Sequence, residues 1–333
     1  MKKVLIFYAA YGGGHLSAAK SVKEYIEDNY RDVEVSLVDC IKYINKFLDK
    51  LTTNAYKEMA KKVPWAWGKV YYRAQKGSIA KISNMTNKLM ASKLSKLIYS
   101  YHPSFIISTH PFSSQMCGYL KRKGKLNCKI ATVLTDFKQH DQWLVESEYM
   151  DFYFVAHMDM RKALIEKGID QSKVYTTGIP ISSRFLVKYD RKIILEEFGL
   201  EDNLKNILFF GGGEFGLGKS QTLEILETFV KDFDNVQVIA ISGRNIKMKE
   251  HFENIVKNYG KEDVIKVLEY TNKVPELMSI SDIIITKPGG LTTSEALVCR
   301  TPYGYYKSYS WTRRRKCGIF GAARSRNLDK KEP

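Results

Sequence analysis

Residues 274–296 read VPELMSISDIIITKPGGLTTSEA, and the fold can be predicted from this stretch. A short helical pattern precedes an apolar run, 283–286, and a Pro-Gly-Gly turn then leads into a second helical pattern rich in hydroxyls. A brief buried run between helical patterns is typical of a strand in a parallel sheet. The turn and the helix start would offer backbone N–H groups and hydroxyls to a diphosphate, and a carboxylate one turn inside could accept both hydroxyls of a ribose. The alternative is an ordinary N-capped helix after a strand.

The same alternation of short apolar runs and amphipathic segments continues on both sides of this stretch. It predicts βαβ units and parallel sheets, so the fold class is α/β with two successive Rossmann-like, doubly wound domains. The 333 residues suffice for two domains of roughly 150 residues each. The changeover is expected near residues 178–190. The expected strands are Val4–Ala9, Val33–Asp39, Phe105–Thr109, Lys129–Thr135 and Phe152–Ala156, then Asn206–Phe210, Val236–Ser242, Val264–Leu268 and Ile283–Thr286.

A glycine-rich turn follows the first strand of each half. Gly12-Gly13-Gly14-His15 leads into a helical pattern, and Gly211-Gly212-Gly213 stands in the corresponding place of the second half. Glycines before a helix start let backbone N–H groups approach an anion or a polar ligand. Neither turn fits the dinucleotide fingerprint or the P-loop spacing. A merely structural tight turn remains the alternative for each.

The net charge of +17 is concentrated in two blocks. Residues 41–126 carry seventeen Lys and Arg against two Asp and Glu, and residues 303–333 carry nine against two. The first block also has apolar residues at helical spacing and the aromatic stretch that contains Trp65, Trp67, Lys69 and Arg73, which suits an interfacial helix on anionic lipid. The alternative is a helix that packs inward behind a solvated lysine face. Nucleic-acid binding fits less well, because none of its usual motifs is present.

Compartment signals are few. The apolar run after Met1 is short, ends in glycines and lacks a cleavage site, so a buried strand is expected rather than a signal peptide. The sequence has no uninterrupted apolar stretch of about 18 residues, so no transmembrane helix is expected. The five cysteines are scattered without a C-x-x-C pair, which suits reduced thiols in a cytosol.

Five motifs, taken together and in order, resemble those of the diacylglycerol glycosyltransferases. That family includes the plant monogalactosyldiacylglycerol synthases and the bacterial processive diacylglycerol glucosyltransferases, and it is related to the MurG peptidoglycan transferase. The resemblance spans residues 1 to about 302. The motifs are Gly12–His15, Thr135-Asp136-Phe137 with His140 and Trp143, Gly178-Ile179-Pro180, Ser242-Gly243-Arg244-Asn245 and Lys287–Glu295.

The resemblance implies a GT-B fold, with two domains facing a cleft. An N-terminal acceptor and membrane-binding domain, 1–180, would be followed by a partial UDP-sugar-binding domain, 181–302. Transfer would invert the anomeric centre without a bound metal or a cofactor, the UDP-sugar being a substrate. The stretch after Val274 would face uracil, Glu295 would bind the ribose, and the other residues implied at the nucleotide are Gly212, Gly213, Ser242, Asn245, Gly289, Gly290, Thr292 and Thr293.

Polar residues follow three strands of the first predicted sheet. Direct displacement needs a base for the acceptor alcohol, and the candidates are His15 and Asp136, which the sequence does not rank. A single histidine or aspartate is more often structural, but three polar groups at three strand ends favour a site. The other residues expected at the acceptor or cleft are Gly13, Gly14, His110, His140 and Trp143.

Residues 303–333 depart from the family's pattern. The family continues with a strand and a P-G-Q-E-E-x-N motif whose Gln and acidic residue contact the donor sugar, whereas this chain reads TPYGYYKSYSWTRRRKCGIF from residue 301 and shows no helix or strand period. Back-translation of the residues from Tyr303, read one base later, gives MVIINPIPGQEE. We therefore hypothesise that an inserted base near codon 302 replaced the end of the domain.

The sequence thus predicts a peripheral enzyme on the cytoplasmic face of the membrane. As the resemblance implies, it would transfer a hexose, with glucose expected although the sequence does not distinguish it from galactose, from a UDP-sugar to 1,2-diacylglycerol. Its partners would be UDP-hexose, diacylglycerol and an anionic membrane surface, with no nucleic acid. The chain as printed would transfer sugar poorly or not at all. The alternatives are a MurG-like transferase with a polyprenyl-diphosphate acceptor and a non-catalytic lipid- or nucleotide-binding protein.

Overall fold

The chain forms two compact units, Met1–Ser182 and Ser183–Pro333, each with its own parallel sheet. In this computed structural model, residues 1–9, 13–44, 80–211, 219–233, 235–287 and 289–305 are described, and their side chains except those of 80–89 and 305. The predicted membrane residues Trp65, Trp67, Lys69 and Arg73 lie outside this range. So do the glycines Gly212 and Gly213 and the tail from residue 306 onward.

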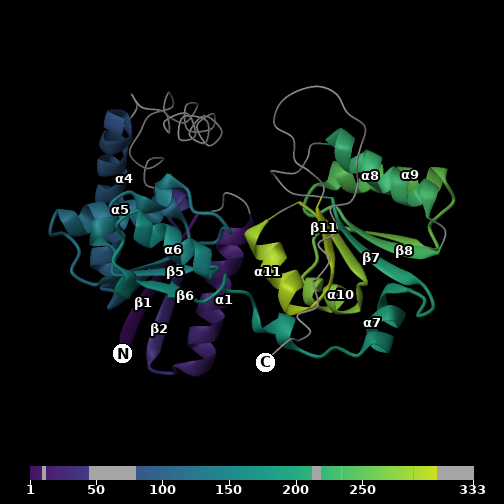
Figure 1. The fold of residues 1–333 in the computed structure, drawn as a ribbon, viewed down its shortest axis with the longest axis horizontal. Coiled ribbons are helices and arrows are strands. Elements are labelled where there is room, and N and C mark those ends of the chain that lie inside the picture. The colour runs from purple at the N-terminus through teal and green to yellow at the C-terminus, as the bar shows by residue number, and fades with distance from the viewer. Residues whose placement is uncertain (10–12, 45–79, 212–218, 234, 288, 306–333) are drawn as a thin grey trace, which may run out of the picture. The chain divides into compact units, whose positions relative to one another are not determined.

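The first unit has a six-stranded parallel sheet in the order β2-β1-β3-β4-β5-β6 (Figure 1). The order reverses between β1 and β3, because the chain passes outward to β2 and then returns across β1. A topological switch point of this kind is where ligands bind in open α/β sheets, outside the carboxyl ends of the strands. The strands are β1 Lys2–Tyr8, β2 Val33–Asp39, β3 Phe105–Ser108, β4 Lys129–Val133, β5 Phe152–Val155 and β6 Val174–Thr176.

Helices cover both faces of this sheet. Side chains of α4, α5 and α6 enter one hydrophobic core against β3 to β5, whereas α1 packs on β1 and β2. Right-handed crossovers require this division, because the chain moves in opposite directions along the sheet before and after β2. The helices are α1 Gly13–Asn29, α4 Ala80–Tyr101, α5 Pro111–Arg122 and α6 Met158–Glu166, with 3-10 turns η1 Asp141–Leu144, η2 Ser147–Tyr149 and η3 Gln171–Lys173.

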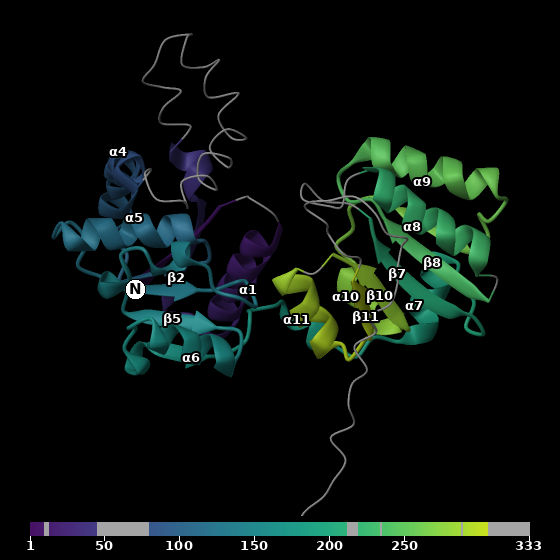
Figure 2. The ribbon, with the colours of Figure 1, turned by 45° about the horizontal axis from the view of Figure 1, so that its top comes forward.

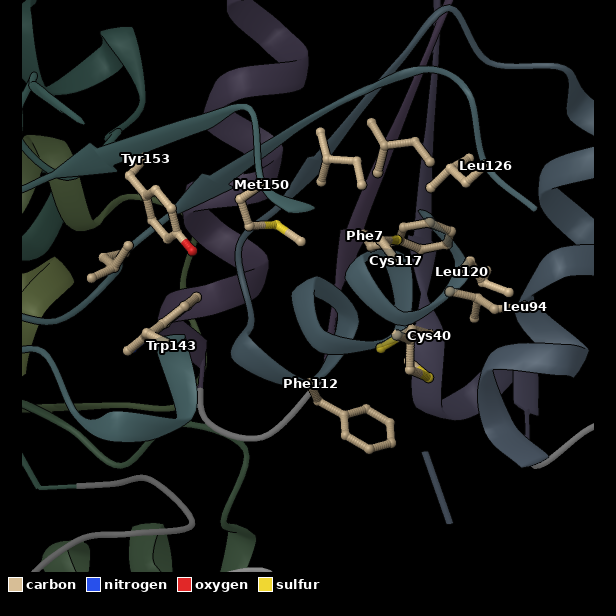
Figure 3. Close-up of a cluster of buried hydrophobic side chains, with 14 of the residues drawn as sticks. Phe7, Cys40, Leu94, Phe112, Cys117, Leu120, Leu126, Trp143, Met150 and Tyr153 are labelled. Carbon is tan, nitrogen blue, oxygen red and sulfur yellow. The ribbon is translucent and has the colours of Figure 1, made fainter. Parts of the chain in front are cut away.

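Figure 3 shows part of this core. Leu94 of α4 lies beside Leu120 of α5, and Trp143 and Tyr153 occupy the end of the cluster away from Leu126. All four of Leu94, Leu120, Trp143 and Tyr153 are at most 1% exposed. Burial of large apolar side chains contributes roughly 1.5–3 kcal/mol for each residue, so this core holds the elements that carry the strand ends in place.

A close approach fixes α5 against the chain that follows β4. A Cβ on Gly118 would lie 2.6 Å from Cβ of Glu146 and 2.8 Å from Cε of Met150. Glu146 has a left-handed φ of 61° and forms a bidentate ion pair with Arg122, so it has little freedom to move away. Only glycine at position 118 lets the two segments pack at this distance.

Gly118→Ala is therefore expected to destabilise the protein, although alanine is the better helix former by up to about 1 kcal/mol. Overpacking of this kind costs roughly 1–3 kcal/mol, so the net loss in unfolding free energy should be about 1 kcal/mol and at most about 2 kcal/mol. Thermal and urea unfolding measure it, with the exposed Lys123→Ala at the end of α5 as control. A variant as stable as the unsubstituted protein would contradict the packing described.

The second unit has a five-stranded parallel sheet in the order β11-β10-β7-β8-β9. Here the order reverses between β7 and β10, so the switch point lies where the glycine turn after β7 and the Pro-Gly-Gly turn after β10 begin. Figures 1 and 2 both show α8 and α9 side by side. The elements are η4 Ser183–Leu186, α7 Arg191–Phe198, β7 Lys205–Phe210, α8 Lys219–Asp232, β8 Val236–Ile241, α9 Ile246–Asn258, β9 Ile265–Leu268, α10 Val274–Ile280, β10 Ile283–Thr286, α11 Gly290–Val298 and β11 Tyr303–Tyr305.

The two predicted doubly wound sheets are confirmed, and all nine predicted strands form with small differences at their ends. Two strands, β6 and β11, were not predicted. Residues 303–305 show no strand period, yet Tyr303–Tyr305 pair in parallel with Ile284–Thr286. Parallel pairing uses backbone groups, so the edge strand forms without an apolar pattern of its own. Among the described helices, none is both long and apolar enough to cross a bilayer.

Candidate active site

His15 lies in the first turn of α1, directly after β1, and its ring is held by the ends of two other strands. Its Nδ1 lies 2.7 Å from the carbonyl oxygen of Thr109, after β3, and 2.8 Å from Oγ1 of Thr135, after β4. A carbonyl oxygen only accepts, so Nδ1 carries the hydrogen and the lone pair of the neutral ring is on Nε2. Burial lowers the pKa of His15, which keeps the ring neutral near pH 7. His15 can therefore accept a proton at Nε2.

His110 stands against His15, with 4.5 Å between the ring centroids and an edge-to-face angle of 74°. Its Nδ1 accepts from the backbone N–H of Phe112 at 3.1 Å, which makes His110 the N-cap of α5. The hydrogen of the neutral ring is therefore on Nε2. Burial lowers the pKa of His110 well below its usual range, and the nearby His15 lowers it further. His110 thus has a structural role as a cap and lies at the site as a neutral ring.

Asp136 comes from the loop after β4 and is half exposed. Nε1 of the buried Trp143 donates to its Oδ2 at 3.4 Å, and Nε2 of His140 lies 3.8 Å from the same oxygen. Partial burial lowers the pKa of His140, against the opposing effect of Asp136. The Trp143 ring is 6.5 Å from that of His15. Asp136 and His15 therefore belong to one cluster.

The structure brings together the acceptor residues predicted from the first unit. His15, His110, Asp136, His140 and Trp143 surround the carboxyl ends of β1, β3 and β4, at the switch point, and Gly13 and Gly14 begin α1 beside them. Two contributors were not among the predicted site residues: Thr109, and Thr135, which was named only as part of a motif. Each is a hydroxyl residue directly before a predicted site residue at a strand end, and that position was the signal available in the sequence.

In the second unit, the start of α11 is open at the carboxyl end of β10. Gly289 is the N-cap and supplies no side-chain bond, and the first intrahelical N–H, that of Thr293, binds the Gly289 carbonyl at 3.0 Å. The N–H groups of Gly290, Leu291 and Thr292 thus have no intrahelical acceptor, which suits an anion. Thr292 is half-buried and Thr293 buried. The predicted diphosphate residues therefore lie around one helix end.

Glu295 lies one turn into α11, and burial raises the pKa of its carboxyl to about 7. No described residue forms an ion pair or hydrogen bond with this carboxyl. In its ionised form the group can accept two hydrogen bonds from neighbouring hydroxyls, as the prediction of a ribose contact requires.

Glu295→Gln is expected to make the protein more stable at pH 8. Because the folded-state pKa, about 7, is above the usual 4.5, wild-type stability is lost as the pH rises from about 4.5 to 7 and then levels off. Gln does not ionise, so the variant should gain on the order of 3 kcal/mol at pH 8 and little at pH 4.5. Urea unfolding across this range, with the exposed Glu269→Gln as control, measures the difference. Equal pH dependence in wild type and variant would refute the raised pKa.

Three other predicted nucleotide residues have local roles in the structure. Oγ of the buried Ser242 donates to the Leu268 carbonyl at 3.1 Å, joining β8 to β9. Oδ1 of Asn245 accepts from the Met248 N–H at 3.1 Å and caps α9. Val274 is the first residue of α10. Their contacts with a nucleotide remain predictions. In the described parts of the chain, no group of three or more His, Cys, Asp or Glu could hold a metal ion.

Solved structures define the class of this fold. Anabaena HepE in complex with UDP and glucose has a TM-score of 0.53 at 13% identity over 91% of this chain and 80% of that one. The Staphylococcus aureus MnaA-UDP structure has a TM-score of 0.57 at 15% identity over 91% and 78%. At these identities the likeness shows the fold alone, and the fold is GT-B, shared by glycosyltransferases and sugar-nucleotide epimerases.

Sequence comparison identifies the family within that class. Residues 15–181 match the monogalactosyldiacylglycerol (MGDG) synthase family, and residues 190–308 match glycosyl transferases group 1. The processive diacylglycerol beta-glucosyltransferase of Bacillus subtilis is 32% identical over 312 residues, 92% of this chain and 78% of that protein. The protein of the same name from Bacillus licheniformis is 31% identical over 92% and 77%. The chain belongs to the MGDG synthase family of glycosyltransferases.

Proposed function

We propose that this protein transfers glucose from UDP-glucose to the free hydroxyl of 1,2-diacylglycerol, with inversion, at the cytoplasmic face of the membrane. The names of the similar Bacillus proteins support the acceptor and the sugar. The observation that carries the chemistry is the hydrogen bond of His15 Nδ1 to the Thr109 carbonyl, because it leaves Nε2 as a proton acceptor.

His15 would act as the general base. Its Nε2 takes the hydroxyl proton of diacylglycerol as the alcohol oxygen bonds to C1 of glucose, and the bond from C1 to the diphosphate oxygen breaks. The electron pair of that bond leaves with UDP. Thr109 and Thr135 hold the ring in its tautomer, and Trp143 orients Asp136, whose negative charge favours the imidazolium that forms. Backbone N–H groups at the start of α11 would stabilise the departing diphosphate.

The basic residues 41–126 would bring the enzyme to an anionic bilayer. No metal or cofactor is required in this proposal, since the N–H groups at the start of α11 take the place of a bound cation at the diphosphate. The chain as printed is proposed to transfer sugar poorly, because residues 303–333 replace the family's sugar-contacting motif.

UDP release from UDP-glucose tests the proposal. The acceptors are vesicles of diacylglycerol in phosphatidylglycerol, diacylglycerol in phosphatidylcholine, and a polyprenyl diphosphate, each with EDTA present. The protein assayed is the chain as printed, or the same chain with the alternative-frame residues from 303, whichever turns over faster. Release that depends on diacylglycerol and is fastest on phosphatidylglycerol supports the proposal. Release only with the polyprenyl acceptor indicates a MurG-like enzyme, and UDP binding with no release indicates a non-catalytic protein.

A further inference from the structure

Lys287 is a partly buried cation with no counter-charge among the described residues. It follows β10 directly, two residues before the N-cap of α11, and its side chain is half-buried. It forms no hydrogen bond or ion pair with a described residue. Burial lowers the pKa of its ammonium, and no carboxylate opposes this effect. Glu295, which lies in α11 after the same strand, is no partner either. A nearby ammonium would lower the pKa of its carboxyl, whereas that pKa is raised and burial is the cause.

Two other partly buried lysines of the described residues are paired with a carboxylate. Lys121 binds Asp151, and Lys249 lies 3.7 Å from Glu253. An ion removed from water without a partner is costly, so an unpaired cation is retained where a ligand supplies the opposite charge. The simpler alternative is a lysine whose methylene chain covers apolar surface while the ammonium reaches water.

The space beside Lys287 is open on the side of the helix end. A Cβ added to Gly289 would have no described atom nearer than 4.0 Å, the closest being the Lys287 carbonyl oxygen. The backbone of Gly289, φ −112° and ψ 138°, is one that any residue can adopt, so the glycine is not explained by conformation. The cation of Lys287, the open space at Gly289 and the N–H groups of residues 290–292 that lack an intrahelical acceptor thus occur next to one another in the chain.

We propose that the Lys287 ammonium binds the diphosphate of the sugar nucleotide, next to the start of α11, and neutralises the charge that develops on it as the sugar leaves. This inference rests on the proposed function. The helix end alone supplies partial positive charge, whereas a lysine supplies a full charge and up to three donors. Two phosphate groups carry more charge than the helix end offers, so the lysine completes the site.

The test measures binding, which does not depend on the sugar-contacting motif. Affinities of the full chain for UDP and for uridine are determined by isothermal titration calorimetry for wild type, Lys287→Met and Lys287→Arg. Met keeps the apolar stem without the charge. Lys205→Met removes a cation at the opposite, amino end of the same sheet and serves as control. Gly289→Val fills the space beside the helix end and tests the diphosphate site without touching Lys287. Thermal unfolding shows that each variant is folded.

Lys287→Met is expected to weaken UDP about 10- to 100-fold, the usual effect of losing a charge-assisted hydrogen bond, and to change uridine affinity less than about twofold. Lys287→Arg should retain most UDP affinity, and Lys205→Met all of it. If Gly289→Val weakens UDP and Lys287→Met does not, the inference is wrong and the proposed diphosphate site stands. Equal losses of UDP and uridine in Lys287→Met would indicate a structural lysine. If wild type binds neither ligand, both the inference and the proposed donor site are wrong.

Discussion

Replacing His15 by Gln is expected to lower kcat by about 10²- to 10⁴-fold, the usual contribution of a positioned general base. Gln keeps hydrogen-bonding capacity toward Thr109 and Thr135 but cannot accept the acceptor's proton at neutral pH. The affinity for UDP should be unchanged, because the predicted nucleotide residues are all in the other unit. Transfer to diacylglycerol vesicles and calorimetric UDP titration measure the two quantities on the faster of the two proteins described above.

The pH profile separates His15 from Asp136 as the base. If His15 is the base, it acts in its neutral form, and burial lowers its pKa. The value of kcat/KM should therefore stay level across neutral pH and fall only as the pH drops through that lowered pKa. Asp136→Asn should cost less than His15→Gln and leave this acidic limb in place. His140→Gln, half exposed beside Asp136, is the control and should cost under about tenfold. A larger loss in Asp136→Asn than in His15→Gln would assign the base to Asp136.

The meeting of these residues could be predicted because parallel sheets align strand ends. His15, His110 and Asp136 each follow a short buried run, and the motif order indicated two such sheets. The tautomer of His15 could not be predicted. The tautomer depends on a hydrogen bond to the backbone carbonyl of Thr109, 94 residues further along the chain. Every residue has such a carbonyl, so the sequence does not show which one accepts the bond.

Elements without their own apolar pattern were also missed. Val174–Thr176 forms the edge strand β6 with only Val174 buried, and β11 is equally short. Such strands are set by a neighbour's free backbone groups, which a sequence pattern does not report. Ser242 and Asn245 show the reverse case. Their place after a strand was predicted, and in the structure the side chain of Ser242 bonds to β9 and that of Asn245 caps α9. The charge pattern of residues 41–126 predicts a docking surface, and the stretch that contains Trp65 and Trp67 lies outside the described range.

Protein of the printed sequence is expected to transfer glucose at least about 100-fold more slowly than the Bacillus subtilis relative assayed on the same vesicles. In the family that this chain resembles, the Gln and acidic residue of P-G-Q-E-E-x-N contact the donor sugar, and residues 303–333 contain neither at that place. Loss of hydrogen bonds between a site and its substrate's hydroxyls weakens transition-state binding and can lower kcat/KM by several orders of magnitude. UDP binding should persist, because the α11 helix end and Lys287 precede the change.

The same hypothesis predicts a gain of function. A second protein, identical to residue 302 and continuing MVIINPIPGQEE in place of the printed residues, should turn over faster by about 100-fold, since it regains the sugar contacts. The strand β11 should form in both, because it pairs with β10 through backbone groups, and the alternative frame also places apolar residues there. A matched third protein, with Gln and both Glu of the restored motif changed to Ala, isolates the motif from the strand. The DNA around codon 302 of the source organism decides the cause: an unbroken frame that encodes the printed tail, or rapid turnover by the printed chain, would refute the hypothesis.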